Sequence, residues 1–160
     1  MNVEIHRILF PTDFSPSSQH VQDYACALAA KFSAELHALH VVPDPMPVPG
    51  SEGSWILPDD CVPRLIQNAE LELATRLEAA LTGNLKVVRS VQVGKPVHTI
   101  IDYAKEHEID LIVLGTHGHT GLSHLLLGSI AEKIVRMATC PVLTVHPKDH
   151  PFRMSETPKV

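Results

Sequence analysis

Two spacings of apolar residues alternate along the chain. Short runs of nearly continuous apolar character are typical of strands that are buried on both faces of a parallel sheet. Such runs predict strands over residues 5–10, 36–42, 85–93, 110–114 and 141–145. Between the runs, apolar residues recur three and four positions apart, as they do on one face of a helix. This second spacing predicts helices over residues 16–32, 62–81, 96–104 and 129–138.

The first helix has a well-marked start, and one long segment has no regular pattern. Serine is a favoured N-cap and proline a favoured first helical residue, as in the pair Ser15 and Pro16. Residues 43–60 are rich in proline and glycine, and they predict a long loop inside the domain rather than a helix or strand. Trp55 in this loop either covers a ligand or pins the loop to the body of the protein.

The alternation of strands and helices predicts an open α/β fold. Right-handed crossovers place helices on both faces of a parallel sheet, for which we expect the strand order 3-2-1-4-5. Ligands bind outside the carboxyl ends of such strands, where the winding reverses. In this order the reversal falls between the first and fourth strands, so Pro11, Thr12 and Asp13 would face the loop after the fourth strand. We expect the domain to span residues 1–147 and a polar tail to span residues 148–160.

The loop after the fourth strand has the composition of a phosphate site. It reads GTHGHTGLSHLLLGS, and two and nine residues separate Gly115, Gly118 and Gly128. Glycine permits positive φ and a close approach to backbone amides, and a helix that begins at Ser129 leaves its first N–H groups unpaired. Anions bind at such helix starts. The spacing fits neither a Walker A loop nor the Rossmann fingerprint, and a plain flexible connection is the alternative.

Individual residues at this point of the sheet have expected roles and alternatives. Asp13 would accept ribose hydroxyls or help to hold a divalent ion, and its alternative is a turn or capping role. Val41 would offer main-chain groups and an apolar wall to a base, and core packing explains its side chain equally well. The phosphates would contact the amides of Gly118, Gly128, Ser129 and Ile130, together with the Ser129 hydroxyl.

Histidines in the loop raise the question of a metal site. His117, His119 and His124 lie close together in sequence, but the loop contains no Cys, Asp or Glu to complete a ligand set. The chain has 11 histidines in all, so three in one loop are weak evidence for a metal. We therefore expect contact with phosphate or solvent. Protonated imidazoles near a phosphate would strengthen its binding as the pH falls.

Composition narrows the possible partners. A length of 160 residues suits one domain, and a net charge of −5 without a Lys/Arg cluster argues against nucleic acid. The apolar runs are too short for a membrane span and the N-terminus lacks the features of a signal peptide, so we expect a cytoplasmic protein. The odd number of well-separated cysteines, Cys26, Cys61 and Cys140, favours a reducing compartment and buried apolar roles.

Several segments together resemble one known family. The resemblance depends on residues 7–15, 39–42, 94–96, 110–118, 128–129 and 140–145. These segments are similar to those of the universal stress protein family, in its ATP-binding branch. The resemblance extends over nearly the whole chain.

The resemblance implies a five-stranded domain that binds ATP together with Mg²⁺ or Mn²⁺. It implies that Asp13 lies against the ribose, with a possible part in holding the metal, and that Val41 gives backbone contacts to adenine. Relatives often carry Arg where this chain has His119 and His124, so AMP and ADP are further expected occupants. The candidate nucleotide-binding residues are Pro11, Thr12, Asp13, Val41, Gly115, Thr116, His117, Gly118, His119, Gly128, Ser129 and Ile130.

The resemblance also implies a homodimer formed through the last strand, Val142–Val145. This agrees with the physics, because an edge strand leaves unpaired backbone groups unless another chain covers them.

Three functions are compatible with the sequence. The first is a dimeric regulatory module of the stress response, whose affinity for an unknown protein partner depends on nucleotide, with residues 43–60 as the contact. The second is a slow ATPase or nucleotidyl-transferring enzyme, for which we identify no convincing base near the glycine loop and therefore no catalytic residue. The third is a dimeric scaffold without nucleotide, against which the intact glycine spacing argues.

Overall fold

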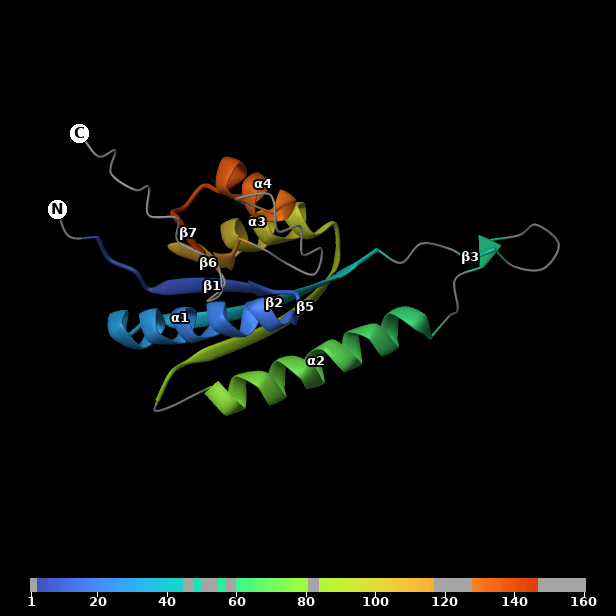
Figure 1. The fold of residues 1–160 in the computed structure, drawn as a ribbon, viewed down its shortest axis with the longest axis horizontal. Coiled ribbons are helices and arrows are strands. Elements are labelled where there is room, and N and C mark those ends of the chain that lie inside the picture. The colour runs from blue at the N-terminus through green and yellow to red at the C-terminus, as the bar shows by residue number, and fades with distance from the viewer. Residues whose placement is uncertain are drawn as a thin grey trace, which may run out of the picture.

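A five-stranded parallel sheet forms the centre of the protein (Figure 1). The computed structural model describes residues 3–44, 48–49, 55–56, 60–80, 84–116 and 128–146. The strands of this sheet are β1 (Arg7–Thr12), β2 (Glu35–Pro43), β5 (Val87–Gly94), β6 (Leu111–Gly115) and β7 (Val142–Val145). Their spatial order is β5-β2-β1-β6-β7, which is the predicted order 3-2-1-4-5 when the strands of this sheet are counted along the chain.

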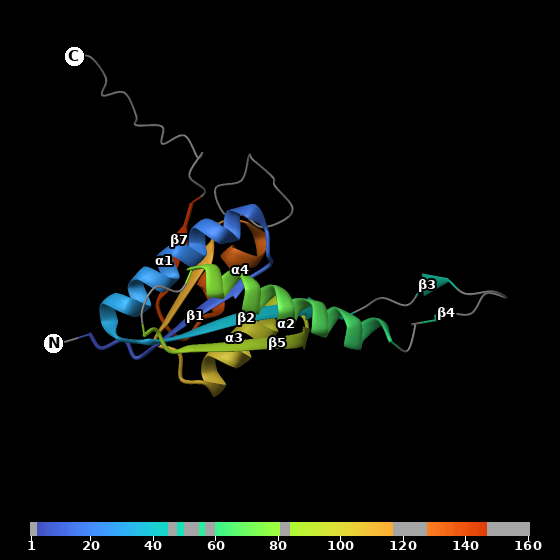
Figure 2. The same cartoon turned by 90° about the horizontal axis from the view of Figure 1, so that it is seen from below.

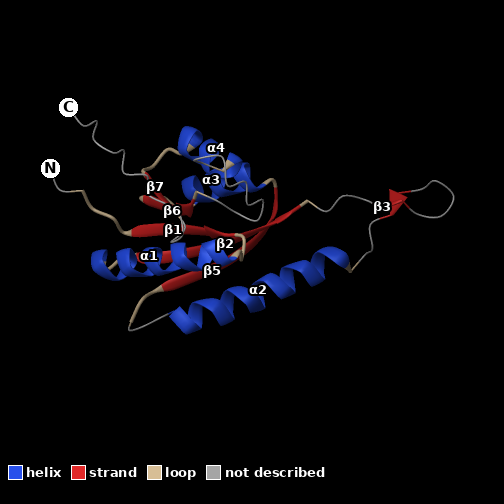
Figure 3. Ribbon diagram, in the orientation of Figure 1, coloured by secondary structure: helices blue, strands red, loops and turns tan. Residues whose placement is uncertain are grey.

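Helices cover both faces of the sheet, as predicted (Figures 1 and 3). Within the described ranges they are α1 (Pro16–Phe32), α2 (Cys61–Ala80), α3 (Pro96–Glu106) and α4 (Ser129–Met137). In Figure 2, α2 lies in front of β2 and β5, on which it packs. Ile8 and Phe10 of β1 pack with α1 and α2, whereas Leu9 packs with α3 and α4. Burial on both faces explains the continuous apolar runs.

Helix α1 has the start that the sequence predicts. The backbone N–H of Ser18 donates to the Oγ of Ser15 at 3.3 Å, and Pro16 is the first helical residue. The helix ends at Ser33, whose φ of 54° lies in the left-handed region and whose N–H donates to the carbonyl of Ala30 at 3.3 Å. These caps satisfy backbone groups that would otherwise lack partners at the two ends.

Two predictions need correction. We expected the first strand to stop at residue 10, but β1 pairs with β2 through Pro11↔Leu39 and Thr12↔His40. We also expected no regular element in residues 43–60, but Val48–Pro49 (β3) and Trp55–Ile56 (β4) form an antiparallel pair. Proline is tolerated there because both strands of a two-stranded sheet are edges, where a donor on one side is not needed.

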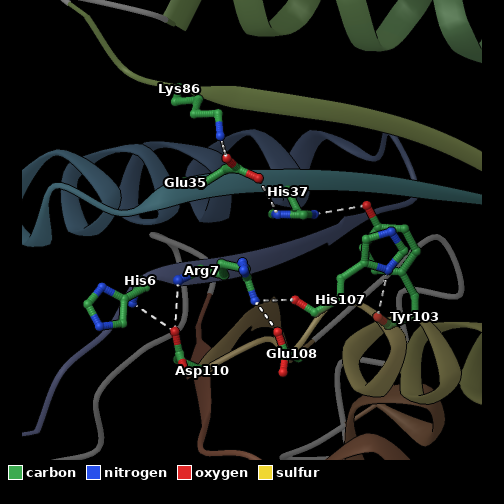
Figure 4. Close-up of polar contacts among 9 residues, drawn as sticks. All are labelled: His6, Arg7, Glu35, His37, Lys86, Tyr103, His107, Glu108 and Asp110. Atoms are coloured by element: carbon green, nitrogen blue, oxygen red, sulfur yellow. Dashed lines mark hydrogen bonds and ion pairs between the residues drawn. The ribbon is translucent and has the colours of Figure 1, made fainter.

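The Asp110 carboxylate links the amino ends of β1 and β6 through hydrogen bonds (Figure 4). The Oδ2 of Asp110 accepts hydrogen bonds from the backbone N–H groups of His6 at 2.7 Å and Arg7 at 2.9 Å. The Arg7 guanidinium donates to the carbonyl of His107 at 3.2 Å and to Glu108 at 2.9 Å. These bonds join the first strand to a turn about 100 residues later, and they place β6 beside β1.

A buried histidine, His37, lies near the hydrogen bonds of Arg7 and Asp110 (Figure 4). His37 is 3% exposed, its Nδ1 lies 3.0 Å from the hydroxyl of Tyr103, and its Nε2 lies 2.9 Å from Glu35. The Tyr103 and His107 rings stack with centroids 3.8 Å apart. Burial lowers the pKa of His37 and raises that of Tyr103, whereas the bond from Lys86 lowers the pKa of Glu35.

The cysteines are free thiols, as their spacing predicts. Cys26 and Cys140 are partly buried against the two layers of the core, and this burial raises the pKa of both thiols. A raised pKa keeps a thiol protonated and poorly nucleophilic, which agrees with an apolar role. Cys61 is half-buried at the first position of α2.

Some predictions concern residues outside the described ranges. They include the end of the second helix at residues 81–83 and the polar tail at residues 148–160. Across the helices that the structure does describe, none has the length and apolar character needed to cross a membrane.

Candidate functional site

The winding of the sheet reverses between β1 and β6. The connection after β1 runs through α1 to one face, and the connection after β6 leads to α4 on the other face. Along the described strands, β1 pairs with β2 at six positions, but with β6 only at Ile8↔Leu111 and Leu9↔Ile112. Pro11 has no N–H to extend the ladder. The carboxyl ends of β1 and β6 therefore lie side by side without continuing the ladder, at the position where open α/β sheets bind ligands.

The turn after β1 is held by short-range hydrogen bonds. The Oδ1 of Asp13 accepts the N–H of Ser15 at 3.0 Å, and the Thr12 hydroxyl accepts the N–H of Phe14 at 3.1 Å. Phe14 has a φ of 62°, a left-handed conformation that is uncommon for a bulky residue. The turn role that the sequence left open for Asp13 is thus present, and it fixes one carboxylate oxygen beside the start of α1.

Two residues from β2 and α2 contact this turn, and our sequence analysis did not predict these contacts. The Nδ1 of His40 lies 2.8 Å from the carbonyl of Thr12, and the His40 ring stacks on Phe14 with centroids 4.2 Å apart. The guanidinium of Arg76 lies 5.5 Å from the centroid of the Phe14 ring. The contact between His40 and Thr12 could have been predicted, because the expected strand order places these two residues side by side. No sequence pattern predicted the left-handed φ of Phe14, which brings the two rings together.

The side chain of Val41, near the end of β2, is buried in the core. Its side chain is 8% exposed and packs with Leu39, Ile100 and Leu114. Core packing, which the sequence left as an equal alternative, accounts for the side chain. The predicted apolar wall at Val41 is therefore part of the core.

The two ends of the glycine loop are joined to each other. The N–H of Gly128 donates to the carbonyl of Thr116 at 2.6 Å, and the N–H of Thr116 donates to Val145 at 3.0 Å. Thr116 is 1% exposed, and its Oγ1 lies 3.2 Å from the Nδ1 of His146. Buried Thr116 thus links β6 to β7 and to the start of α4 through backbone hydrogen bonds. It holds the start of α4 at the carboxyl end of β6.

Helix α4 begins without a side-chain cap. Gly128 is its N-cap, and no side chain there bonds to the first turn. Ser129 and Ile130 follow as exposed first-turn residues, and the earliest helical bond runs from Glu132 to the Gly128 carbonyl at 2.9 Å. Helical geometry leaves the N–H groups of the first turn without intrahelical partners. Such donors are suited to bind an anion.

We expected glycine to permit a positive φ in the loop after β6, and this reason is wrong for Gly115 and Gly128. Gly128 has φ −65° and ψ 152°, which any residue adopts, and Gly115 also has no positive φ. Among the described glycines only Gly94, with φ 155°, has a positive value. The backbone dihedral therefore does not require glycine at 115 or 128.

The rest of the predicted site lies outside the described residues. This applies to His117, Gly118, His119 and His124. The structure thus brings together Pro11, Thr12, Asp13, Gly115, Thr116, Gly128, Ser129 and Ile130, with Val41 on the adjacent strand β2. Over the described ranges, no group of three or more His, Cys, Asp or Glu residues is arranged to hold a metal.

Taken together, the strand order and the open helix start define an open α/β protein with a ligand position at the switch point. The sequence model of the universal stress protein family matches residues 4–146. A universal stress protein of Methanocaldococcus jannaschii, MJ0531, is 37% identical over 141 residues, which are 87% of this chain and 81% of that protein. The chain belongs to the universal stress protein family.

Solved structures of similar proteins have the same fold. The structure of MJ0577 superposes with a TM-score of 0.74 at 26% identity, covering 92% of this chain and 99% of that one. A universal stress protein solved in complex with cAMP superposes with a TM-score of 0.66 at 28% identity, covering 89% of this chain and 98% of that one. At least one similar protein of this fold therefore binds an adenine nucleotide.

Proposed function

We propose that this protein binds an adenine nucleotide at the switch point between β1 and β6 and acts as a regulatory module. The observation that carries the proposal is the start of α4, which has no side-chain cap and is tied by Gly128 to the end of β6. Amides at an open helix start suit phosphate groups, and parallel sheets bind nucleotides at this edge. The cAMP complex of a similar protein supports the same ligand class.

In this proposal each part of the nucleotide has a partner. The phosphates would contact the amides of Gly118, Gly128, Ser129 and Ile130. Asp13 lies beside the ribose, and the main chain of Val41 contacts the base. Pro11, Thr12, Gly115 and Thr116 shape the backbone around the ligand, and His117 and His119 add positive charge at low pH.

Among the described residues of the proposed site, Asp13 has the carboxylate that would help to hold a divalent ion arriving with the nucleotide. Mg²⁺ and Mn²⁺ prefer oxygen ligands, and Mg²⁺ is usually held by one or two carboxylates together with phosphates and water. Asp13 supplies one such carboxylate at the site. When bound, the ion would neutralise phosphate charge, and Asp13 would help to hold it.

We further propose that the protein forms a homodimer through β7, the last of the described strands. This strand is at one edge of the sheet, and Leu143 on it is 38% exposed. Pairing with a second copy would satisfy the free edge and cover this side chain.

The nucleotide and its fate can be determined directly. The purified protein is denatured, released nucleotides are identified by mass, and phosphate release from added ATP is measured with and without Mg²⁺. We expect bound ATP, ADP or AMP and turnover well below about 1 s⁻¹, the lower end for ordinary enzymes. Faster turnover would favour the ATPase or nucleotidyl-transfer alternative. Failure to retain or bind any adenine nucleotide would leave the dimeric scaffold as the function.

A further inference from the structure

A cavity lies between α3 and α4, lined by residues other than those of the proposed nucleotide site. This cavity, of about 630 Å³, lies between the start of α3 and the second half of α4. Figure 1 shows these two helices next to each other, and they share the same core layer. The cavity is lined by Lys95, Pro96, Val97, His98, Lys133, Arg136 and Met137. None of these residues belongs to the proposed nucleotide site.

The charge of this cavity is opposite to that of the whole chain. Lys95, Lys133 and Arg136 are exposed permanent cations, and none of the lining residues from the described part of the chain is acidic. The chain overall has 13 Lys and Arg against 18 Asp and Glu. Arg136 has Glu132 as a neighbour, but the contact is 3.6 Å long and both side chains are largely exposed. Such a pair contributes little, so the cavity keeps its positive character.

The start of α3 has backbone N–H groups without intrahelical partners, in addition to the cationic side chains. Lys95 is the N-cap of α3 and makes no side-chain cap, and Pro96, the first helical residue, has no N–H. The first intrahelical bond runs from Thr99 to the Lys95 carbonyl at 2.9 Å. The N–H groups of Val97 and His98 are therefore first-turn donors without intrahelical partners, and both residues line the cavity.

Apolar side chains complete the lining. Val97 and Met137 lie among the cations and come from the two different helices. Methionine is flexible and adapts to flat or irregular apolar ligands. The lining therefore includes cationic side chains, the start of α3 and two apolar side chains, and the volume lies in the usual range for a small-molecule site.

We propose that this cavity binds a small phosphate ester with an apolar or planar body. The phosphate contacts Lys95, Lys133 and Arg136, and the body rests on Val97 and Met137. A phosphate dianion suits these groups because charge-assisted hydrogen bonds are about twice as strong as neutral ones. The volume favours a small molecule over an extended acidic peptide, which is the alternative occupant. The proposal does not depend on nucleotide binding at the switch point.

The test uses 1-naphthyl phosphate as the probe, with nuclear magnetic resonance to locate it. We expect saturable shifts at the Val97 and His98 amides and the Met137 methyl, and a several-fold weaker affinity at high salt. The neutral analogue 1-naphthol should cause no saturable shifts there. The double variant Lys133→Gln/Arg136→Gln should bind the probe at least about tenfold more weakly, because two charge-assisted contacts are removed.

A matched control has the same loss of charge outside the cavity. The double variant Arg64→Gln/Lys105→Gln changes one exposed arginine and one exposed lysine, on α2 and at the far end of α3. It should bind the probe with the affinity of the unchanged protein. Equal affinities of the two double variants, with both shown to be folded by thermal melting, would overturn the proposal.

Two further outcomes would also overturn it. Probe shifts confined to Thr12, Asp13 and the Gly128–Ile130 amides would place the anion at the switch point alone. Saturation of the cavity by a hexaglutamate peptide, without saturation by 1-naphthyl phosphate, would assign the surface to an acidic protein partner. ATP binding at the switch point is read from separate signals, so failure here is distinguishable from failure of the proposed function.

Discussion

The Nδ1 of His37 lies 3.0 Å from the hydroxyl of Tyr103, in the buried layer between β2 and α3. Both side chains are nearly inaccessible, at 3% and 2% exposure. Glu35, His107 and Arg7 are the charged or titratable groups that influence this histidine. Burial is the largest influence on its pKa and lowers it, against the opposite influence of Glu35.

Stability should therefore fall as the pH falls below neutral. The unfolded chain takes up a proton on His37 near pH 6.5. The folded chain, in which the pKa of His37 is lower, takes it up only at a lower pH. The free energy of unfolding should decrease from pH 7.5 to 5.5 by at most about 1.4 kcal/mol per pH unit from this group. Urea unfolding at several pH values measures it.

A pair of variants isolates this effect. His37→Gln should reduce the pH slope of the free energy of unfolding, whereas His98→Gln, at an exposed position on α3, should leave the slope unchanged. If the two variants had the same slope as the unchanged protein, His37 would not be the source of the pH dependence.

The two carboxylates near Arg7 should differ in their contribution to stability. Asp110→Ala leaves the N–H groups of His6 and Arg7 without their acceptor, and should cost about 2 kcal/mol. Glu108→Ala breaks an ion pair whose glutamate side chain is 81% exposed, and should cost less than about 1 kcal/mol. Denaturant midpoints of the two variants measure the difference. Equal losses would mean that Asp110 does not anchor β1 to β6.

The proposed dimer depends on the exposed edge strand. Leu143→Glu puts a charge on β7 and should shift the protein towards a monomer, because a buried unpaired charge is costly. Leu71→Glu, at a 68% exposed position on α2, is the matched control and should leave the oligomeric state unchanged. Sedimentation velocity at micromolar concentration distinguishes the two. A stable monomer for the unchanged protein would rule out the β7 dimer at that concentration.

Nucleotide affinity should increase as the pH falls from 8 to 6. The sequence places His117, His119 and His124 in the glycine loop, where protonated imidazoles would offset phosphate charge. Calorimetric titration of ATP across this range measures the effect, and His119→Gln/His124→Gln should flatten it. An affinity that is independent of pH would remove these histidines from the account.

Local patterns in the sequence were sufficient to predict the sheet. The apolar runs that became β1 and β6 alternate with helical spacing, and the Ser15 cap marked the start of α1. The order 3-2-1-4-5 was an expectation for an open α/β sheet that the crossover rules alone do not determine; the structure confirms it, and it brings Asp13 and Gly115 to one edge.

The details that were not predicted depend on contacts between distant residues or on backbone dihedrals. The bond from Arg7 to Asp110 joins residues 103 positions apart, and no local pattern indicates it. The left-handed φ of Phe14 and the ordinary φ of Gly128 are opposite to what residue type suggests. The positions of the candidate residues in the sheet were thus predictable, but their backbone conformations were not.

Titration of ATP against Gly128→Leu tests the central claim most directly. Leucine is compatible with the dihedrals of Gly128, so the variant should fold, but its side chain would occupy the space where a phosphate approaches the first turn of α4. The account predicts an affinity at least about tenfold weaker, a loss of about 1.4 kcal/mol or more. Ala30→Leu, exposed near the end of α1, should bind normally. Unchanged ATP affinity in a folded Gly128→Leu protein would contradict the account.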